Sequence, residues 1–265
     1  MYPFTYHKPD SLAAAAGLAA KAENAKLLAG GMTLLPTMKQ RLASPDDLID
    51  LGQLADLRGI SVAGDHVTIG AMTRHYDVAN SKDVQKAIPA LAELAGMIGD
   101  PAVRNRGTIG GSLANNDPAA DYPAAALALG ATIITNKREI SADDYFTGLF
   151  ETALEEGEIV TKVRFPIPAK AAYEKFRNPA SRYAIVGVFV ASTKSGVRLA
   201  VTGAGSDGVF RVPAMEAALK ADFSAKALES LTVSSEGLNS DIHADAEYRA
   251  HLIKVMARRA VAKAH

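Results

Sequence analysis

The segment from Arg104 to Pro123, RNRGTIGGSLANNDPAADYP, decides which fold we predict for this chain. It combines two adjacent glycines with three Asn, two Asp and two Pro residues. Long polar, glycine-rich loops are uncommon inside compact domains and are often functional. We therefore interpret this segment as a loop that holds a ligand.

A second pair of glycines lies near the N-terminus, in LLAGGMT from Leu27 to Thr33. An apolar run that predicts a strand leads into Gly30-Gly31, and Thr33 is placed to cap a helix. Glycine lets the backbone turn sharply and lets a ligand come close, and N–H groups at a helix start bind anions. Taken alone, this segment is more simply a strand-to-helix turn.

Hydroxyl groups flank the glycines of the first segment, because Thr108 and Ser112 bracket Gly110-Gly111. Hydroxyls beside bare backbone suit phosphate oxygens. Polar groups for a sugar, or for an ordered turn, follow at Asn115, Asn116, Asp117 and Asp121. Alone, a capped turn explains this segment as well as a phosphate loop does. Two such segments in one chain of this size favour a single ligand with two phosphates.

Composition excludes several classes of function. The 265 residues suit two or three small domains, and 29 basic residues balance 29 acidic ones, so no basic field predicts nucleic-acid or membrane binding. The absence of cysteine excludes disulfides, thiol catalysis and iron–sulfur clusters ligated by this chain. Without a membrane-length apolar run or a signal-peptide core, we expect a soluble cytoplasmic protein.

The order of helix and strand patterns predicts an α+β protein in three parts rather than a regular βαβ ladder. The first part covers residues 1–56. The second, 57–168, begins with the hairpin pattern ISVAGDHVTIGAMT, continues with two helices predicted over 74–81 and 83–98, and ends with the strand pattern GEIVTKVRFPIP. The third part, 169–265, has three strand-like runs followed by helices.

A third glycine motif matches a dinucleotide-binding pattern but lacks the context that such a site needs. GAGSDG, from Gly203 to Gly208, matches G-x-G-x-x-G and follows a predicted strand. A dinucleotide-binding fingerprint also needs a helix that starts in the loop, whereas VFRVP, which ends at Pro213, is strand-like. We predict a connection between strands and reject a nicotinamide site here.

No catalytic or metal-binding side chain is predicted. His75 lies near a predicted helix start, where a lone His is more often a surface or capping residue than a base. The six His residues show no H-x-x-x-H spacing, and no G-x-S-x-G elbow supports a serine hydrolase.

Taken together, these motifs resemble the FAD-binding medium subunit of molybdenum hydroxylases, the family of xanthine dehydrogenase and aerobic carbon monoxide dehydrogenase. The likeness runs nearly end to end, through AGGMTLLPTMKQRL, IGAMTRHYDVANS, the segment 104–123 and YEKFRNPASRYAIVGVFV. It implies a two-subdomain FAD-binding fold of the vanillyl-alcohol oxidase (PCMH) type, followed by a small α/β C-terminal domain. GGSLANNDPAADYP is similar to members named carbon monoxide dehydrogenase.

The resemblance also implies a set of FAD contacts. Both glycine segments are expected to hold the diphosphate, through Ala29, Gly30, Gly31, Met32, Thr33, Thr108, Ile109, Gly110 and Gly111. Asp121 is expected at the adenosine part and Lys175 near the flavin end, where it would stabilise the anionic reduced flavin. Ile159 or Val160 is expected over the ring edge, and Tyr183 beside the isoalloxazine. Met32, Ser112 and Asn115 depart from residues common in the family, which leaves backbone N–H donors unchanged.

The family resemblance implies partners as well. A large subunit would hold molybdopterin and a small subunit two [2Fe–2S] clusters, assembled with this chain as a dimer of heterotrimers. This chain would hold FAD, collect electrons one at a time and pass them to an acceptor. The zero cysteine count agrees independently, since the clusters must then belong to a partner. The flavin is the reacting group, so no catalytic residue is assigned.

Two alternatives stay open at this point. A stand-alone FAD reductase of the UDP-N-acetylenolpyruvoylglucosamine reductase type would use a similar scaffold, but it needs a proton donor and a carboxylate near the C-terminus for which no matching motif is found. A non-enzymatic scaffold that has lost FAD is the other alternative. The intact pairs Gly30-Gly31 and Gly110-Gly111 argue against that loss.

Overall fold

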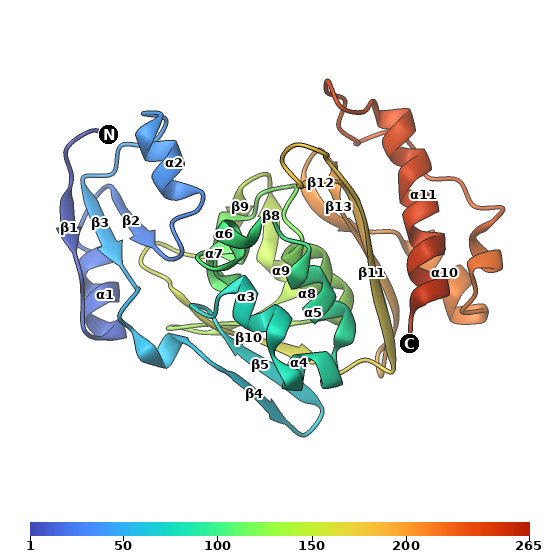
Figure 1. Ribbon diagram of the computed structural model, residues 1–265, viewed down its shortest axis with the longest axis horizontal. Helices are drawn as coiled ribbons and strands as arrows, with labels where there is room; N and C mark the ends of the chain where they lie inside the picture. The colour runs from blue at the N-terminus through green and yellow to red at the C-terminus, as the bar shows by residue number, and fades with distance from the viewer.

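Three main sheets follow one another along the chain in the computed structural model, which describes all 265 residues (Figure 1). The first sheet has three parallel strands in the order β1-β3-β2. Its elements are β1 (Thr5–His7), α1 (Leu12–Ala19), β2 (Ala25–Leu28), α2 (Leu34–Lys39), β3 (Asp47–Asp50) and the 3-10 turn η1 (Ala55–Leu57). Ser11 begins α1, because its hydroxyl accepts a hydrogen bond from the Ala14 N–H.

The second sheet has five antiparallel strands in the order β4-β5-β10-β6-β7. They are β4 (Ile60–Ala63), β5 (His66–Gly70), β6 (Thr132–Thr135), β7 (Glu139–Ser141) and β10 (Val160–Pro166). The predicted hairpin at Gly64-Asp65 is present as β4–β5. Central strand β10 alternates in the expected way, with Val163 and Phe165 fully buried between more exposed neighbours.

Short helices occupy the chain between β5 and β10. They are α3 (His75–Asn80), α4 (Lys82–Ala87), α5 (Pro89–Gly96), α6 (Pro101–Arg104), α7 (Ile109–Asn115), α8 (Tyr122–Leu129) and α9 (Ala142–Tyr145), with the small hairpin β8 (Phe146–Gly148) and β9 (Glu151–Thr152). The single helix predicted over 83–98 is wrong. Pro89 cannot continue a helix and forces Ile88 out of helical geometry (φ −142°, ψ 73°), so α4 ends and α5 begins.

The segment 104–123 is not one long loop, which corrects our prediction. Its centre is α7, whose N-cap Thr108 accepts a hydrogen bond from the Gly111 N–H through its hydroxyl. Gly110 and Gly111 therefore lie in the first turn of a helix. Glycine is a poor helix former, which is why the pair suggested a loop.

The third sheet lies between two layers of helices (Figure 1). Its antiparallel strands, in the order β11-β12-β13-β14, are β11 (Lys170–Arg177), β12 (Ala184–Thr193), β13 (Gly196–Gly205) and β14 (Gly208–Arg211). Helices α5 and α8 pack on one face, and α10 (Pro213–Ala221) and α11 (Ala246–Lys263) on the other, with the turn η2 (Ala225–Leu228) beside them. Because both faces are covered, β12 is apolar from Ala184 to Ala191: Phe189 joins one core and Val188 the other.

The largest core crosses the predicted boundary at residue 168. It contains Val163 and Leu91 from the second part together with Tyr173 and Phe189 from the third sheet. The boundaries predicted after residues 56 and 168 thus fall between sheets, but the second one does not separate cores. The division into 1–56, 57–168 and 169–265 stays a prediction.

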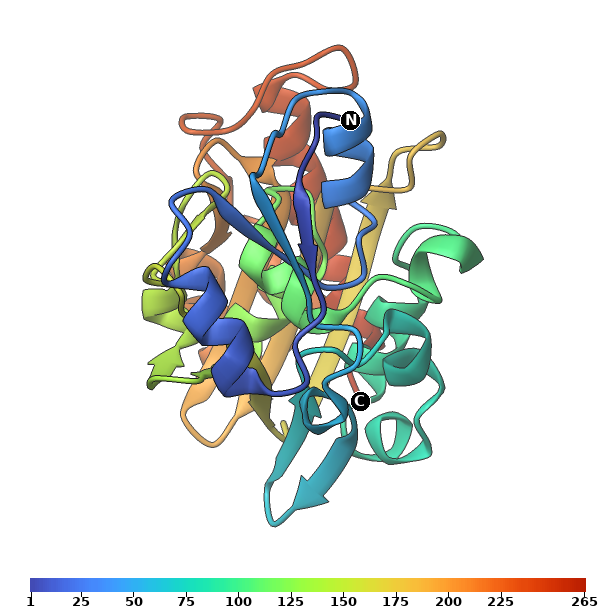
Figure 2. The same ribbon diagram turned by 90° about the vertical axis from the view of Figure 1, so that its left-hand side faces the viewer.

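The predicted connection between strands at GAGSDG is confirmed by the strand pairing. Gly205 and Gly208 pair across a tight turn between β13 and β14, and the next helix begins only at Pro213. Figure 2 views the molecule from the side of the N-terminal part and shows the β4–β5 hairpin projecting at one end. None of the helices combines the length and the apolar character needed to cross a membrane.

Arg249 generates a prediction about stability. Its buried guanidinium donates to the carbonyl oxygens of Ile185 (2.7 Å) and Gly203 (2.9 Å) and pairs with Asp241. Arg249→Met leaves two buried carbonyls without a donor, so we expect the free energy of unfolding in urea to fall by about 3 kcal/mol. Arg259→Met, at an exposed position of the same helix, is the control. An equal, small loss in both variants would contradict this account.

Candidate functional site

A cavity of about 450 Å³ receives walls from all three parts of the chain. This volume lies in the usual range for small-molecule sites. Twelve of the fourteen site residues predicted from sequence line it: Ala29, Gly30, Gly31, Met32, Thr33, Thr108, Gly110, Gly111, Asp121, Ile159, Val160 and Tyr183. The folded chain therefore brings together residues that lie up to 154 positions apart in the sequence.

The two glycine segments pack directly against each other. A Cβ on Gly30 would lie 2.2 Å from the Arg106 carbonyl oxygen, and one on Gly110 would lie 2.4 Å from the Cβ of Ala71. One on Gly111 would lie 3.2 Å from the Cβ of Ala29. At Gly30 and Gly110 only glycine permits these approaches, so these two glycines are required by packing as well as by any ligand.

The first glycine segment forms an anion-binding nest. The backbone N–H groups of residues 30–33 make no hydrogen bond within the chain. Gly31 adopts a left-handed conformation (φ 76°), whereas Thr33 is right-handed helical, and its hydroxyl does not cap α2. Successive backbone N–H groups in such alternating conformations form a concavity that binds anions.

The glycines of the second segment have their own backbone donors paired within the chain. The Ile109 N–H donates to the Thr73 carbonyl (3.1 Å), the Gly110 N–H to the Ala71 carbonyl (2.8 Å), and the Gly111 N–H to the Thr108 hydroxyl. Two diphosphate-binding loops with equivalent backbone donors were expected. Residues 30–33 present four unpaired N–H groups, and the Thr108 N–H is a further donor without a partner in the chain, at the part of the cavity wall that leads into α7.

A buried charge network lies behind one wall of the cavity. The Asp121 carboxylate, 4% exposed, accepts a hydrogen bond from the Tyr173 hydroxyl at 2.5 Å and pairs with the Lys175 ammonium at 2.9 Å. Lys175 also donates to the Met97 carbonyl. Burial raises the pKa of Asp121, while the Lys175 charge and the Tyr173 hydrogen bond act in the opposite direction.

These contacts correct the expected placement of Lys175. Lys175 and Asp121 form an ion pair, so they lie at the same place and not at opposite ends of a bound FAD. The Lys175 ammonium does not line the cavity, because Asp121 covers it. Ile109 is likewise absent from the cavity wall, since its side chain is fully buried in the core. Ile159 packs in the small N-terminal core, apart from Lys175.

Tyr183 lies on the turn between β11 and β12, where its side chain is 46% exposed and lines the cavity. Its neighbour Arg182 (φ 64°) also lines the cavity and was missed by sequence reasoning, as were Lys26, Gly99 and Gly107. Gly107 directly precedes the Thr108 motif, and that adjacency was a usable signal. Lys26 likewise directly precedes the first glycine segment, whereas Gly99 and Arg182 lie in turns outside both glycine segments.

His75 is buried, which corrects its interpretation as a surface or capping residue. It is 5% exposed, lines the cavity and packs against Tyr122 with ring centroids 5.4 Å apart. Its Nδ1 atom has no hydrogen-bond partner. Burial, and then the charge of Arg104, lower the pKa of His75 to about 4. The imidazole is therefore neutral at pH 7.

The two asparagines of the central segment have different positions. Asn115 lines the cavity. Asn116 ends α7 in a left-handed conformation (φ 42°, ψ 48°), and its amide donates to the carbonyls of Gly148 (3.0 Å) and Glu151 (2.7 Å). Asn116 thus ties the end of α7 to the β8–β9 hairpin.

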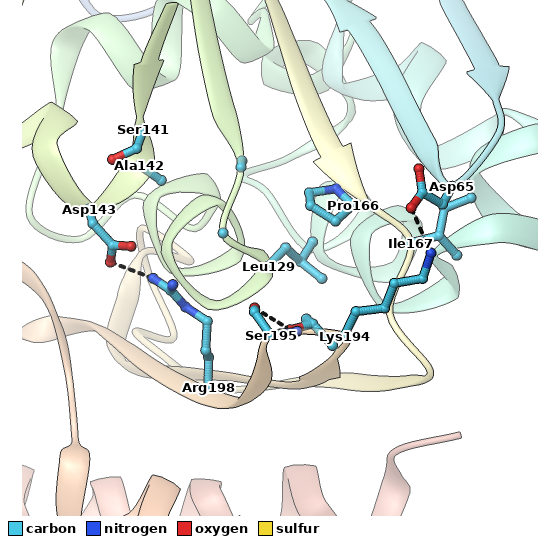
Figure 3. Close-up of a pocket in the computed structure, with 13 residues that line it drawn as sticks. Asp65, Leu129, Ser141, Ala142, Asp143, Pro166, Ile167, Lys194, Ser195 and Arg198 are labelled. Atoms are coloured by element: carbon cyan, nitrogen blue, oxygen red, sulfur yellow. Dashed lines mark hydrogen bonds and ion pairs between the residues drawn. The ribbon is translucent and has the colours of Figure 1, made fainter.

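A second, smaller cavity lies between the second and third sheets (Figure 3). The Lys194 ammonium reaches Asp65 at 2.8 Å, and Arg198 reaches Asp143. Because these charges already neutralise one another, this cavity presents no unpaired charge to a ligand. We interpret it as a contact region between the two sheets.

The first cavity fits FAD in the features that the chain itself presents. Residues 30–33 offer unpaired N–H donors for a diphosphate, and the glycines keep the adjacent walls free of Cβ atoms. Asp121 and Asp117, which line the same cavity, offer acceptors for sugar hydroxyls.

Comparison with known proteins gives a family match over most of the chain. The family described as "FAD binding domain in molybdopterin dehydrogenase" matches residues 2–168. The chain is 37% identical to the carbon monoxide dehydrogenase medium chain of Hydrogenophaga pseudoflava, over 97% of this chain and 96% of that one. It is also 37% identical to the nicotine 6-hydroxylase medium subunit of Paenarthrobacter nicotinovorans, over 98% and 96%.

A solved structure extends this similarity to the fold. A chain of the reconstituted CO dehydrogenase from Oligotropha carboxidovorans superimposes with a TM-score of 0.90 at 35% identity, covering 99% of this chain and 97% of that chain. The expected α+β FAD-binding fold is therefore confirmed over both the sheets that form the cavity and the third sheet behind it.

Gly30 generates a prediction about ligand binding. Gly30→Ala places a methyl group 2.2 Å from the Arg106 carbonyl and forces the two glycine segments apart. We expect FAD affinity, measured by flavin fluorescence, to fall about tenfold or more. Gly17→Ala is the matched control, because a methyl group there meets no atom within 4 Å. Normal FAD binding by the Gly30→Ala variant would contradict the account.

His75 generates a prediction about pH. Folded His75 takes up a proton only near pH 4, whereas the unfolded chain does so below about pH 6.5. Its contribution to stability is therefore complete above pH 6.5 and declines as the pH falls towards 4. When the pH falls from about 7 to 5, we expect the free energy of unfolding to decrease by about 2 kcal/mol because of His75.

Urea unfolding at both pH values checks this sign and size. Between the two pH values, the free energy of unfolding of the His75→Phe variant should fall by about 2 kcal/mol less than that of the wild type. His251→Gln, at an exposed position of α11, should behave as the wild type does. Parallel pH profiles for the His75→Phe variant and the wild type would show that His75 is not responsible.

Proposed function

Because this chain belongs to the family of FAD-binding domains in molybdopterin dehydrogenases, we propose that it is the FAD-holding electron-transfer subunit of a molybdenum hydroxylase complex. The observation that carries the proposal is the match along nearly the whole length of medium chains with different substrates. The unpaired backbone donors of residues 30–33 support it independently.

The partners follow from the chemistry that this chain lacks. With no cysteine it supplies no ligands for iron–sulfur clusters, so a small subunit with two [2Fe–2S] clusters delivers the electrons. A large subunit holds molybdopterin and binds the substrate, and the complex is a dimer of heterotrimers. When bound, FAD accepts two electrons, one at a time, and releases them to an acceptor.

The residues of this chain bind and orient the cofactor. Residues 30–33 hold the diphosphate through their N–H groups, and Gly110 and Gly111 allow α7 to pack close to it. Asp121 accepts a hydrogen bond from a sugar hydroxyl, and Tyr183 lies beside the ring at the cavity mouth. The domains proposed are 1–56 and 57–168, which hold FAD, and 169–265. The sheet order supports this division.

The substrate is set by the partner and not by this chain. This chain is equally identical to the medium subunits of a carbon monoxide enzyme and of a nicotine enzyme. A carbon monoxide dehydrogenase is therefore one specific form of the proposal. The proposal includes a cytoplasmic location, because a chain without cysteine needs no oxidising compartment. The comparisons give no support to the stand-alone reductase or to a scaffold without FAD.

Copurification of the chain with its small and large partners tests the proposal. We expect FAD in an equimolar amount, released on heating, and reduction of the flavin by substrate only when both partners are present. Carbon monoxide, a nicotine-type heterocycle, a purine and an aldehyde form the substrate panel. A chain that carries no flavin would overturn the proposal, as would flavin reduction by NAD(P)H and a sugar nucleotide in the isolated chain.

A further inference from the structure

The Asp121 carboxylate is the only charged group of the buried network that reaches the cavity. Asp121 lines the cavity, whereas Tyr173 and Lys175 approach it from the far side, on β11. A carboxylate has about four acceptor positions on its two oxygens. Tyr173 and Lys175 occupy at most three of them. At least one acceptor position therefore stays available to a donor in the cavity.

A glycine on the neighbouring strand creates the space for the Tyr173 hydroxyl. Gly187 on β12 lies opposite Lys175 in the sheet register. A Cβ on Gly187 would lie 2.3 Å from the Tyr173 hydroxyl oxygen and 2.9 Å from the Cγ2 of Thr202. Any side chain at residue 187 would displace the hydroxyl from Asp121, 66 positions earlier in the chain.

The Tyr173 hydroxyl is placed for Asp121 and for nothing else. Tyr173 is fully buried, its ring packs against Phe189 at 6.1 Å between centroids, and its only side-chain hydrogen bond goes to Asp121. A phenylalanine would fill the same core space. The hydroxyl is therefore the one part of this side chain that packing alone does not explain.

We propose that Tyr173 is a positioning residue of the FAD site: its hydroxyl, admitted by Gly187, holds the Asp121 carboxylate towards the cavity as an acceptor for a sugar hydroxyl of FAD. This inference rests on the proposed function, because it needs FAD in the cavity. It assigns to Lys175 a supporting role through Asp121 and not a contact with the ring.

The pH dependence of FAD binding separates positioning from simple core packing. FAD affinity falls where Asp121 takes up a proton, and the charged or titratable groups around Asp121 are Asp117, Tyr122, Tyr173, Lys175 and Tyr183. Loss of the Tyr173 hydroxyl removes a hydrogen bond to the ionised form, so Asp121 then protonates at a higher pH. A change that only loosened the core would lower stability without moving this acid limb.

The test measures FAD dissociation constants of the full chain as a function of pH. For Tyr173→Phe we expect about tenfold weaker binding near pH 7 and an acid limb shifted upward by about one pH unit. In the Asp121→Asn background the same change should alter affinity less than about twofold, since the two residues act as one unit. Tyr145→Phe, which removes an equally buried hydroxyl without a hydrogen-bond partner, should leave FAD binding unchanged.

Gly187→Ala is the second variant. It displaces the Tyr173 hydroxyl but leaves Tyr173 and Asp121 themselves unsubstituted. It should weaken FAD binding and shift the acid limb in the same direction. Wild-type affinity and pH profile in both Tyr173→Phe and Gly187→Ala would overturn the inference, as would an undiminished effect of Tyr173→Phe in the Asp121→Asn background. A wild-type chain that binds no FAD would instead overturn the proposed function, and this inference with it.

Discussion

Two close approaches, of Gly30 to Arg106 and of Gly110 to Ala71, are the constraint on which the rest of the site depends. Neither position has room for a single methyl group, because Arg106 and Ala71 already occupy the space. The Gly30 approach holds the first glycine segment against the chain that leads into α7, and the N–H groups of residues 30–33 make no hydrogen bond within the chain. A cavity with unpaired backbone donors is the result, and a diphosphate is the ligand chemistry that satisfies them.

The third sheet contributes to the site from behind. Strand β12 is buried on both faces, so it joins the core around α8 to the core under α11. Strand β11 runs beside it and presents Tyr173 and Lys175 to Asp121 at the start of α8. The C-terminal part therefore does more than cover the site, because its Tyr173 and Lys175 side chains bind the Asp121 carboxylate in the cavity wall.

Sequence reasoning recovered the elements whose signals are local. The β4–β5 hairpin, the long apolar run of β12 and the strand turn at GAGSDG all follow from period, turn residues and context. It failed where a tertiary contact overrides local preference. Gly110 and Gly111 stand in a helix, where Ala71 and Ala29 lie against them and leave little room for a side chain. The pairing of Asp121 with Lys175, 54 residues apart, and the burial of His75 are likewise set by packing that no local pattern reports.

The use of backbone donors in the nest also has a consequence for how the protein tolerates change. Side chains such as Met32 can be exchanged without removing a single N–H group, whereas Gly30 admits no exchange at all. Most of the sequence is then free to drift while the cofactor grip persists. One flavin-carrying module can thus be inherited by enzymes whose substrates have nothing in common.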